Sequence, residues 1–206
     1  MRDYNETDRN ILALAKKMLL SNGLLNTDMK DIAKELGCSR STLYRHFSSK
    51  GDILIILATD ALKTIRDSLI IPDGFRFVTG YDAFCWQLNS MMDSMIHHVD
   101  DITFLRDFDC FFTSSYPGTT NTEAFLKQVT KSTYKSPLQE SFDRGMKDGS
   151  IRQVNNPELC VLTIVHSCIA LAQRTLPREQ HFIEEYGYGQ EILREQVKIL
   201  TDYVKG

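Results

Sequence analysis

The chain has 206 residues, of which 42% are hydrophobic and 25% charged, with only 11 glycines and 5 prolines. This composition is typical of a globular protein and excludes a disordered, fibrous or linker-rich chain. The longest unbroken apolar run, Ile53 to Ala58, is far shorter than the roughly 20 residues of a membrane-spanning helix. The first residues also lack the apolar stretch of a secretory signal. We therefore expect a cytoplasmic protein that does not interact with a membrane.

The net charge of −3 conceals a local asymmetry. Residues 1–50 carry nine Lys/Arg and six Asp/Glu, a net charge of +3, whereas the remainder carries 15 basic and 21 acidic residues, a net charge of −6. No acidic residue occurs between Cys38 and Lys50. A basic segment in an acidic protein predicts nucleic-acid contact confined to one small module.

The five cysteines are scattered and form no C-x-x-C pair, so we expect buried, reduced thiols and neither a disulfide framework nor a structural zinc site. The run His97-His98-Val99-Asp100-Asp101 looks like a metal cluster on paper. Adjacent helical residues point about 100° apart, however, which favours a polar helix end. We expect neither a metal ion nor a cofactor.

Apolar residues recur at helical spacing along the chain, and no segment shows convincing strand alternation. Capping residues such as Asp28, Ser39, Ser49 and Asn156 mark helix starts, and Ser136-Pro137 interrupts a helix or starts a new one. We expect a loop over 177–189. Helices are expected at about 11–22, 28–36, 39–47, 50–69, 81–96, 102–112, 122–135, 137–148, 157–174 and 192–204.

Residues 28–47 have the pattern of a helix-turn-helix. A short helix buries Ile32 and Ala33, Gly37 allows a tight turn, and Leu43 and Phe47 anchor the second helix. A helix docked in the major groove contacts base edges with its N-terminal and outward side chains, and arginine can bond guanine in a bidentate manner. The far end suits phosphate contact. The candidate DNA-binding residues are Arg40, Ser41, Thr42, Tyr44, Arg45, His46 and Lys50.

Asp31-Ile32-Ala33, Gly37, Ser39, Thr42 to Phe47 and Ser49-Lys50 resemble the signature of the TetR family of bacterial transcriptional regulators. The resemblance covers about residues 7–60, and a weaker likeness follows from Arg144 to Glu158. It implies an all-α homodimer with an N-terminal three-helix helix-turn-helix head (1–50) joined to a C-terminal helical ligand-binding and dimerisation domain (51–206). The family often has an acidic residue where this chain has Gly51, a departure that we expect to affect only helix propensity.

Residues 75–116 hold ten aromatic residues in 42 positions, well above the 10% of the whole chain. Ordinary core packing explains this, and so does an aromatic-lined cavity with a few polar groups, which would suit a small hydrophobic or aromatic effector. For His166, which lies within an apolar helix run, a core histidine is the favoured interpretation and a ligand contact is the alternative. The candidate ligand-binding residues are Phe84, Leu88, Met91, Phe108, Phe112, Tyr134, Phe142 and His166.

The helix after Pro157 is apolar over too much of its circumference for a solvated surface, and the last helix adds a second apolar stripe. We expect both to pair with a second copy in a four-helix interface. The candidate interface residues are Val161, Val165, Ile169, Leu200 and Val204.

These features predict a ligand-responsive repressor that binds a palindromic double-stranded DNA operator as a homodimer and is released by a small, mostly apolar effector. One alternative is an activator, or a regulator controlled by a protein partner. A helical enzyme whose N-terminal helices are coincidental is a further alternative, but no catalytic motif supports it, and we expect no enzyme activity.

Overall fold

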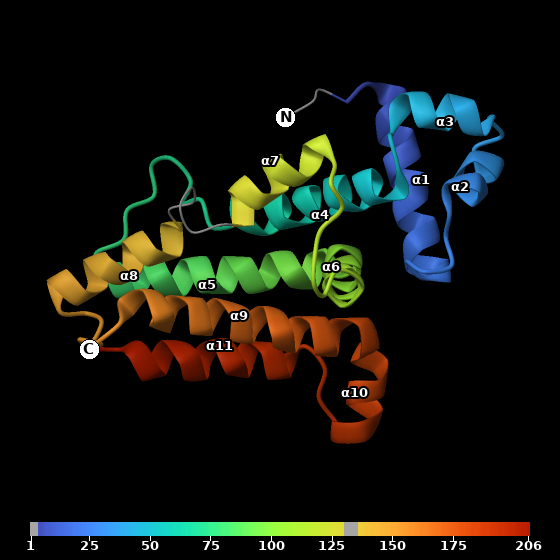
Figure 1. Ribbon diagram of the computed structural model, residues 1–206. Coiled ribbons are helices and arrows are strands. Elements are labelled where there is room, and N and C mark those ends of the chain that lie inside the picture. The colour runs from blue at the N-terminus through green and yellow to red at the C-terminus, as the bar shows by residue number, and fades with distance from the viewer. Residues whose placement is uncertain (1–3, 130–135) are drawn as a thin grey trace. The chain divides into compact units, whose positions relative to one another are not determined.

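The computed structural model describes residues 4–129 and 136–206, and no strand occurs among them apart from an isolated bridge between Ile151 and Lys205. The expected all-α class is confirmed (Figure 1). The helices are α1 (Glu6–Asn22), α2 (Met29–Glu35), α3 (Arg40–His46), α4 (Lys50–Asp67), α5 (Gly80–His97), α6 (Val99–Phe111), α7 (Thr120–Val129), α8 (Pro137–Asp148), α9 (Pro157–Thr175), the 3-10 turn η1 (Leu176–Arg178), α10 (Glu179–Tyr186) and α11 (Glu191–Val204).

The chain forms two compact units. Unit 1 comprises residues 1–62 and 103–134, and unit 2 comprises residues 63–102 and 135–206. Unit 1 therefore contains the helix-turn-helix segment together with the start of α4 and a segment from the middle of the chain. The domain boundary that we expect at residue 50 stays a prediction.

Three helices of unit 1 form around the apolar spacing that the sequence shows. Leu19 of α1, Ile32 of α2 and Leu43 of α3 are completely buried, as is Phe47 at the end of α3. Burial of one apolar stripe per helix therefore stabilises the group.

Unit 1 also contains a cluster of aromatic rings built on Phe108 of α6. Its ring centroid lies 4.9 Å from that of Phe112, 5.6 Å from that of Phe125 in α7 and 5.9 Å from that of Tyr116. The contacts with Phe112 and Phe125 are edge-to-face, an arrangement that the ring quadrupole favours. The cluster joins α6, the segment after it and α7.

Unit 2 is organised by the close packing of α5 against α8. A Cβ atom on Gly80 would lie 2.0 Å from the backbone nitrogen of Gly145, so only glycine permits this approach. Asp148 accepts a hydrogen bond from Gly80 N at 2.8 Å, and Ser150 Oγ accepts one from Tyr81 N at 3.1 Å. The segment after α8 thus satisfies free amides at the start of α5.

One stretch of the described chain, Pro157–Tyr186, is long and apolar enough to cross a membrane by length and composition alone, although only a third of its most apolar window is buried. Core helices pass the same test. The run includes α9, η1 and α10.

The expected loop at 177–189 is wrong, because α10 occupies Glu179–Tyr186. The flanking Pro177 and Gly187 suggested a loop, but Phe182 supplies one buried anchor that is enough to hold two helical turns in place. The expectation of buried cysteines is also wrong for most of them, since Cys168 is buried whereas Cys110 is exposed and the others are half-buried.

Candidate nucleic-acid interface

The turn of the helix-turn-helix is set by local hydrogen bonds. Asp28 N donates to the Asp31 carboxylate at 2.9 Å at the start of α2. Gly37 has a φ of 66°, the left-handed conformation that glycine adopts without steric cost. Ser39 Oγ then accepts from Thr42 N at 3.1 Å, which caps α3. These bonds confirm Asp28 and Ser39 as the N-cap residues of α2 and α3.

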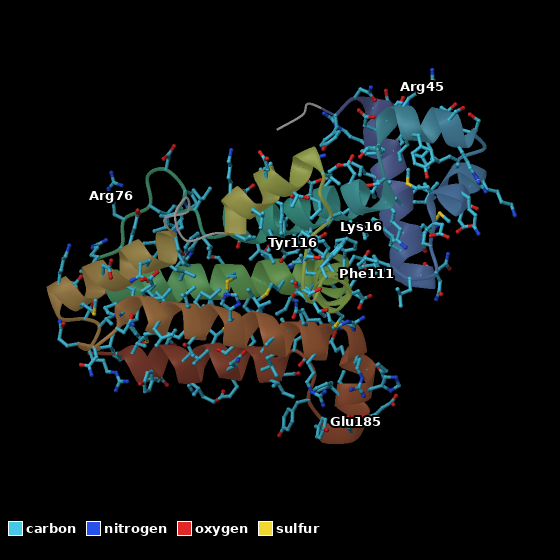
Figure 2. All side chains as sticks on the ribbon, viewed as in Figure 1. Lys16, Arg45, Arg76, Phe111, Tyr116 and Glu185 are labelled. Carbon is cyan, nitrogen blue, oxygen red and sulfur yellow. The ribbon has the colours of Figure 1, made fainter. Side chains whose placement is uncertain are left out.

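The outward face of α3 is polar, basic and free of acidic residues. Arg40, Ser41, Tyr44 and Arg45 are exposed, and Figure 2 shows Arg45 on the outer side of the helix. Thr42 is half-buried, and its hydroxyl lies 2.9 Å from that of Ser39. Four of the seven candidate residues are therefore available to a ligand, and one contributes mainly to the cap.

His46 takes a different position from the one we expected. Its Nδ1 donates to Oδ1 of buried Asp8 at 2.7 Å, while Asp8 Oδ2 accepts from Asn5 N at 3.2 Å. Asp8 thus connects the end of α3 to the start of α1. No sequence pattern indicated this role, because a carboxylate three residues after Asn5 indicates only a capping box. His46 thus helps to position α3, and its contact with a DNA phosphate stays a prediction.

Lys50 is less exposed than the residues on the outward face of α3. Its side chain is 19% exposed, its Nζ lies 3.9 Å from Asp28 Oδ1, and the same atom lies 5.5 Å from the centroid of the Phe111 ring. DNA contact by Lys50 stays a prediction, and its surroundings favour a role in packing the start of α4.

The start of α4 is held by residues far away in the sequence. A Cβ atom on Gly51 would lie 2.8 Å from Cβ of Pro117, and Asn121 Nδ2 donates to Oδ1 of buried Asp52 at 2.7 Å. Ser49 Oγ accepts from Asp52 N at 3.1 Å and confirms the expected cap. Gly51 therefore does more than lower helix propensity: it leaves room for Pro117.

The candidate ligand-binding residues divide between the two units. In unit 2, Phe84, Leu88, Met91 and Phe142 are buried, and the rings of Phe84 and Phe142 lie edge-to-face at 5.3 Å. In unit 1, Phe108 and Phe112 belong to the aromatic cluster. Tyr134 lies outside the described residues. His166 is exposed on α9, so the core interpretation of this histidine is wrong.

The sequence did not single out Gln87 of α5. This side chain is 1% exposed, and its Nε2 donates to the Leu69 carbonyl at 2.9 Å. Within the described part of the chain its Oε1 has no hydrogen-bond partner. The orientation of the amide is fixed, because the Leu69 carbonyl can only accept.

The candidate interface residues differ in their burial, and their role in a dimer stays a prediction. Val161 and Val204 lie in the core of unit 2, and Val165, Ile169 and Leu200 are half-buried. The spacing of apolar residues along a helix does not show which of two neighbouring apolar stripes packs against the core. The exposed large apolar residues of the same two helices are Leu159, Leu162, Ile199 and Tyr203.

His97 and His98 lie at the end of α5, where their Nδ1 atoms bond the carbonyls of Asp93 at 2.7 Å and Ser94 at 2.8 Å. This agrees with the polar helix end that we expected. No group of three or more His, Cys, Asp or Glu side chains that could hold a metal ion occurs within the described ranges.

The N-terminal part of the chain matches a known family of regulatory proteins. Residues 11–56 match the model of bacterial regulatory proteins of the tetR family. An HTH-type transcriptional regulator of Staphylococcus aureus (strain MRSA252) is 42% identical over 98 residues, which are 47% of this chain and 52% of that protein. The chain thus spans about half the length of this curated relative.

Solved structures show the same fold over nearly the whole chain. A tetR-family regulatory protein from Rhodococcus RHA1 has a TM-score of 0.72 at 16% identity and covers 98% of both chains. The TetR-family regulator PfmR from Thermus thermophilus has a TM-score of 0.68 at 20% identity, covering 93% of this chain and 97% of that one. The family is one of transcriptional regulators and not of enzymes. The helix-turn-helix thus lies in a segment that matches the TetR family of bacterial regulatory proteins, and the chain shares the all-helical fold of solved TetR-family regulators.

Proposed function

We propose that this protein is a DNA-binding transcriptional repressor that binds a palindromic double-stranded operator as a homodimer and releases it when a small, mostly apolar effector binds. The observation that carries the proposal is the exposed, acid-free face of α3, which lies within the family-matched segment. Arg40, Ser41, Tyr44 and Arg45 are the residues that we assign to DNA, with α3 in the major groove.

The homodimer is supported by the outer faces of α9 and α11. Leu159, Leu162, Ile199 and Tyr203 are exposed on these helices, and α9 lies in the stretch that is apolar enough to cross a membrane. A helix that is apolar on two sides needs a second partner besides its own core. Two copies joined through this face bring two α3 helices to a palindromic site.

We place the effector site in unit 2. The buried residues Phe84, Leu88, Met91 and Phe142 supply apolar surface there, and the free Oε1 of Gln87 supplies one acceptor near them in α5. A buried acceptor without a partner is costly, so a donor on the effector would be favoured there. We infer an apolar effector with one hydroxyl or amide group.

Contacts within unit 1 offer a way for the middle of the chain to influence α3. Pro117 and Asn121 hold the start of α4 through Gly51 and Asp52, and α4 begins four residues after α3 ends. A change in the segment 111–121 would therefore shift the start of α4. An effector releases DNA only if it binds the shifted arrangement more tightly than the DNA-bound one.

The test is binding of the purified protein to a labelled duplex from the region upstream of its own gene. We expect Arg45→Ala to weaken binding by about 1–3 kcal/mol if Arg45 contacts a base. Arg76→Ala removes the same charge from an exposed loop of unit 2 and is the matched control. Equal affinity of the two variants, both folded, would refute the DNA-binding assignment. If expression of a reporter gene placed behind the operator falls when the gene for this protein is removed, the protein is an activator and not a repressor.

A further inference from the structure

Helix α10 is short but firmly anchored in unit 2. Phe182 is buried, and the guanidinium carbons of Arg174 and Arg178 lie 5.6 Å and 5.9 Å from its ring centroid. At the base of the helix, Gln190 donates from its backbone N and its Nε2 to the carboxylate of Glu179, at 3.3 Å and 3.1 Å. The helix is thus held in one position by contacts at its start and along its inner side.

The exposed side of this anchored helix carries large apolar and aromatic side chains beside the charged residues Glu184 and Glu185. Ile183 is 44% exposed, Tyr186 is 56% exposed, and Tyr188 in the turn after the helix is 60% exposed. Tyrosine offers a large, rigid contact area with a polar tip, which is why it is enriched where proteins meet. Because α10 is already held in place, a partner that binds these three large side chains pays little to order them. The helix is therefore suited to contact a second protein surface.

We propose that α10 is a clasp that packs Ile183, Tyr186 and Tyr188 against a second copy of this chain. The proposal rests on the homodimer of the proposed function and adds to it a contact outside the α9–α11 face. α10 follows α9 through η1, and a turn at Gly187 leads on to α11, so the clasp is continuous with that face.

The direction in which α10 extends indicates that a second copy of this chain covers its exposed side chains. α5 packs against both α9 and α11, so the exposed residues of these two helices face away from α5. Figure 1 shows α10 extending from the end of α9 beyond α11, on the side away from α5. A copy seated on the exposed face of α9 and α11 therefore lies beside α10 and covers its tyrosines.

The experiment is sedimentation equilibrium of the full chain from nanomolar to micromolar concentration. We expect the double variant Ile183→Ser/Tyr186→Ser to raise the dimer dissociation constant at least tenfold, about 1.4 kcal/mol. The double variant Phe75→Ser/Val78→Ser removes exposed apolar side chains from another surface of unit 2 and should leave the constant unchanged. Far-UV circular dichroism checks that both variants stay helical.

Hydroxyl-radical footprinting of the wild type provides a second measurement that needs no variant. Oxidation of Tyr186 and Tyr188 should fall when the protein passes from monomer to dimer. A dimer with unchanged affinity in the α10 variant and equally oxidised tyrosines overturns the clasp and leaves the homodimer intact. A wild type that stays monomeric up to tens of micromolar overturns both.

Discussion

Asp148 is a surface residue whose carboxylate organises a helix end in unit 2. It accepts hydrogen bonds from Gly80 N at 2.8 Å and from Ser150 N at 3.0 Å, and also from the Ser150 hydroxyl. The Ser150 hydroxyl, followed by the two amides, holds the pKa of this carboxyl below its usual value. Asp148 and Ser150 belong to the segment after Arg144 that weakly resembles the TetR family. Their structural role is to hold the start of α5.

The lowered pKa of Asp148 predicts a pH-dependent contribution to stability. The folded pKa lies below the unfolded value of about 3.9, so the contribution is present above that pH and is lost as the pH falls through the folded pKa. We expect Asp148→Asn to lower the melting temperature at pH 7, with the gap to the wild type closing below about pH 4. Asp73→Asn, in an exposed loop, is the control. A gap that persists unchanged in acid would exclude this account.

Several segments of this protein approach each other closely because particular residues are small. α5 and α8 meet at Gly80 and Gly145, and a Cβ atom on Gly145 would lie 2.6 Å from the Ile151 side chain. In unit 1, Gly51 serves the same purpose for Pro117. The two contacts differ, because at Gly80 the obstacle is backbone, which cannot rotate away as a side chain can.

A substitution at Gly80 should therefore be costly. A Cβ atom there meets the Gly145 backbone N at 2.0 Å and its Cα at 2.4 Å, so α5 and α8 must separate. We expect Gly80→Ala to lower the free energy of unfolding by an amount at or above the upper end of the about 1–3 kcal/mol typical of overpacking. Gly118→Ala, where no atom lies within 4 Å of the added Cβ, is the matched control. Urea unfolding measures both, and similar stabilities would contradict the close approach.

At the scale of the whole molecule, the two proposed activities lie in different compact units. The candidate DNA-binding residues belong to unit 1, whereas α9, α10 and α11 belong to unit 2. In the proposed homodimer, operator binding by two α3 helices requires unit 2 to join the two copies. Loss of the dimer should therefore weaken operator binding without any change in the residues that contact DNA.

This dependence can be measured with one substitution on the α9–α11 face. We expect Leu162→Glu to produce monomers, because a buried carboxylate without a partner is disfavoured in an apolar interface. Its operator affinity should fall at least tenfold, while its melting curve stays cooperative. Val78→Glu adds the same charge at an exposed loop position of unit 2 and should remain dimeric. Light scattering measures the oligomeric state, and the duplex-binding assay measures the operator affinity. A dimeric Leu162→Glu variant would place the interface elsewhere.

Local sequence determined most of the secondary structure of this protein. Apolar spacing along α1, α2 and α3 and the caps at Asp28 and Ser39 act over three or four residues, so they can be read without tertiary contacts. The helix-turn-helix and its outward arginines follow from this short-range pattern. α10 was missed because one buried Phe182 between Pro177 and Gly187 gives too weak a periodic signal.

Only the tertiary structure decided how the candidate residues are used. Asp8 lies 38 positions from His46, and Asp52 lies 69 positions from Asn121, yet each pair forms a hydrogen bond. Such partners depend on how the chain folds back on itself, which no local spacing reveals. The same holds for Val161 and Val204, since packing alone determines which stripe of an apolar helix enters the core. The sequence by itself thus identified the candidate DNA-binding surface, and tertiary packing decided which residues support it.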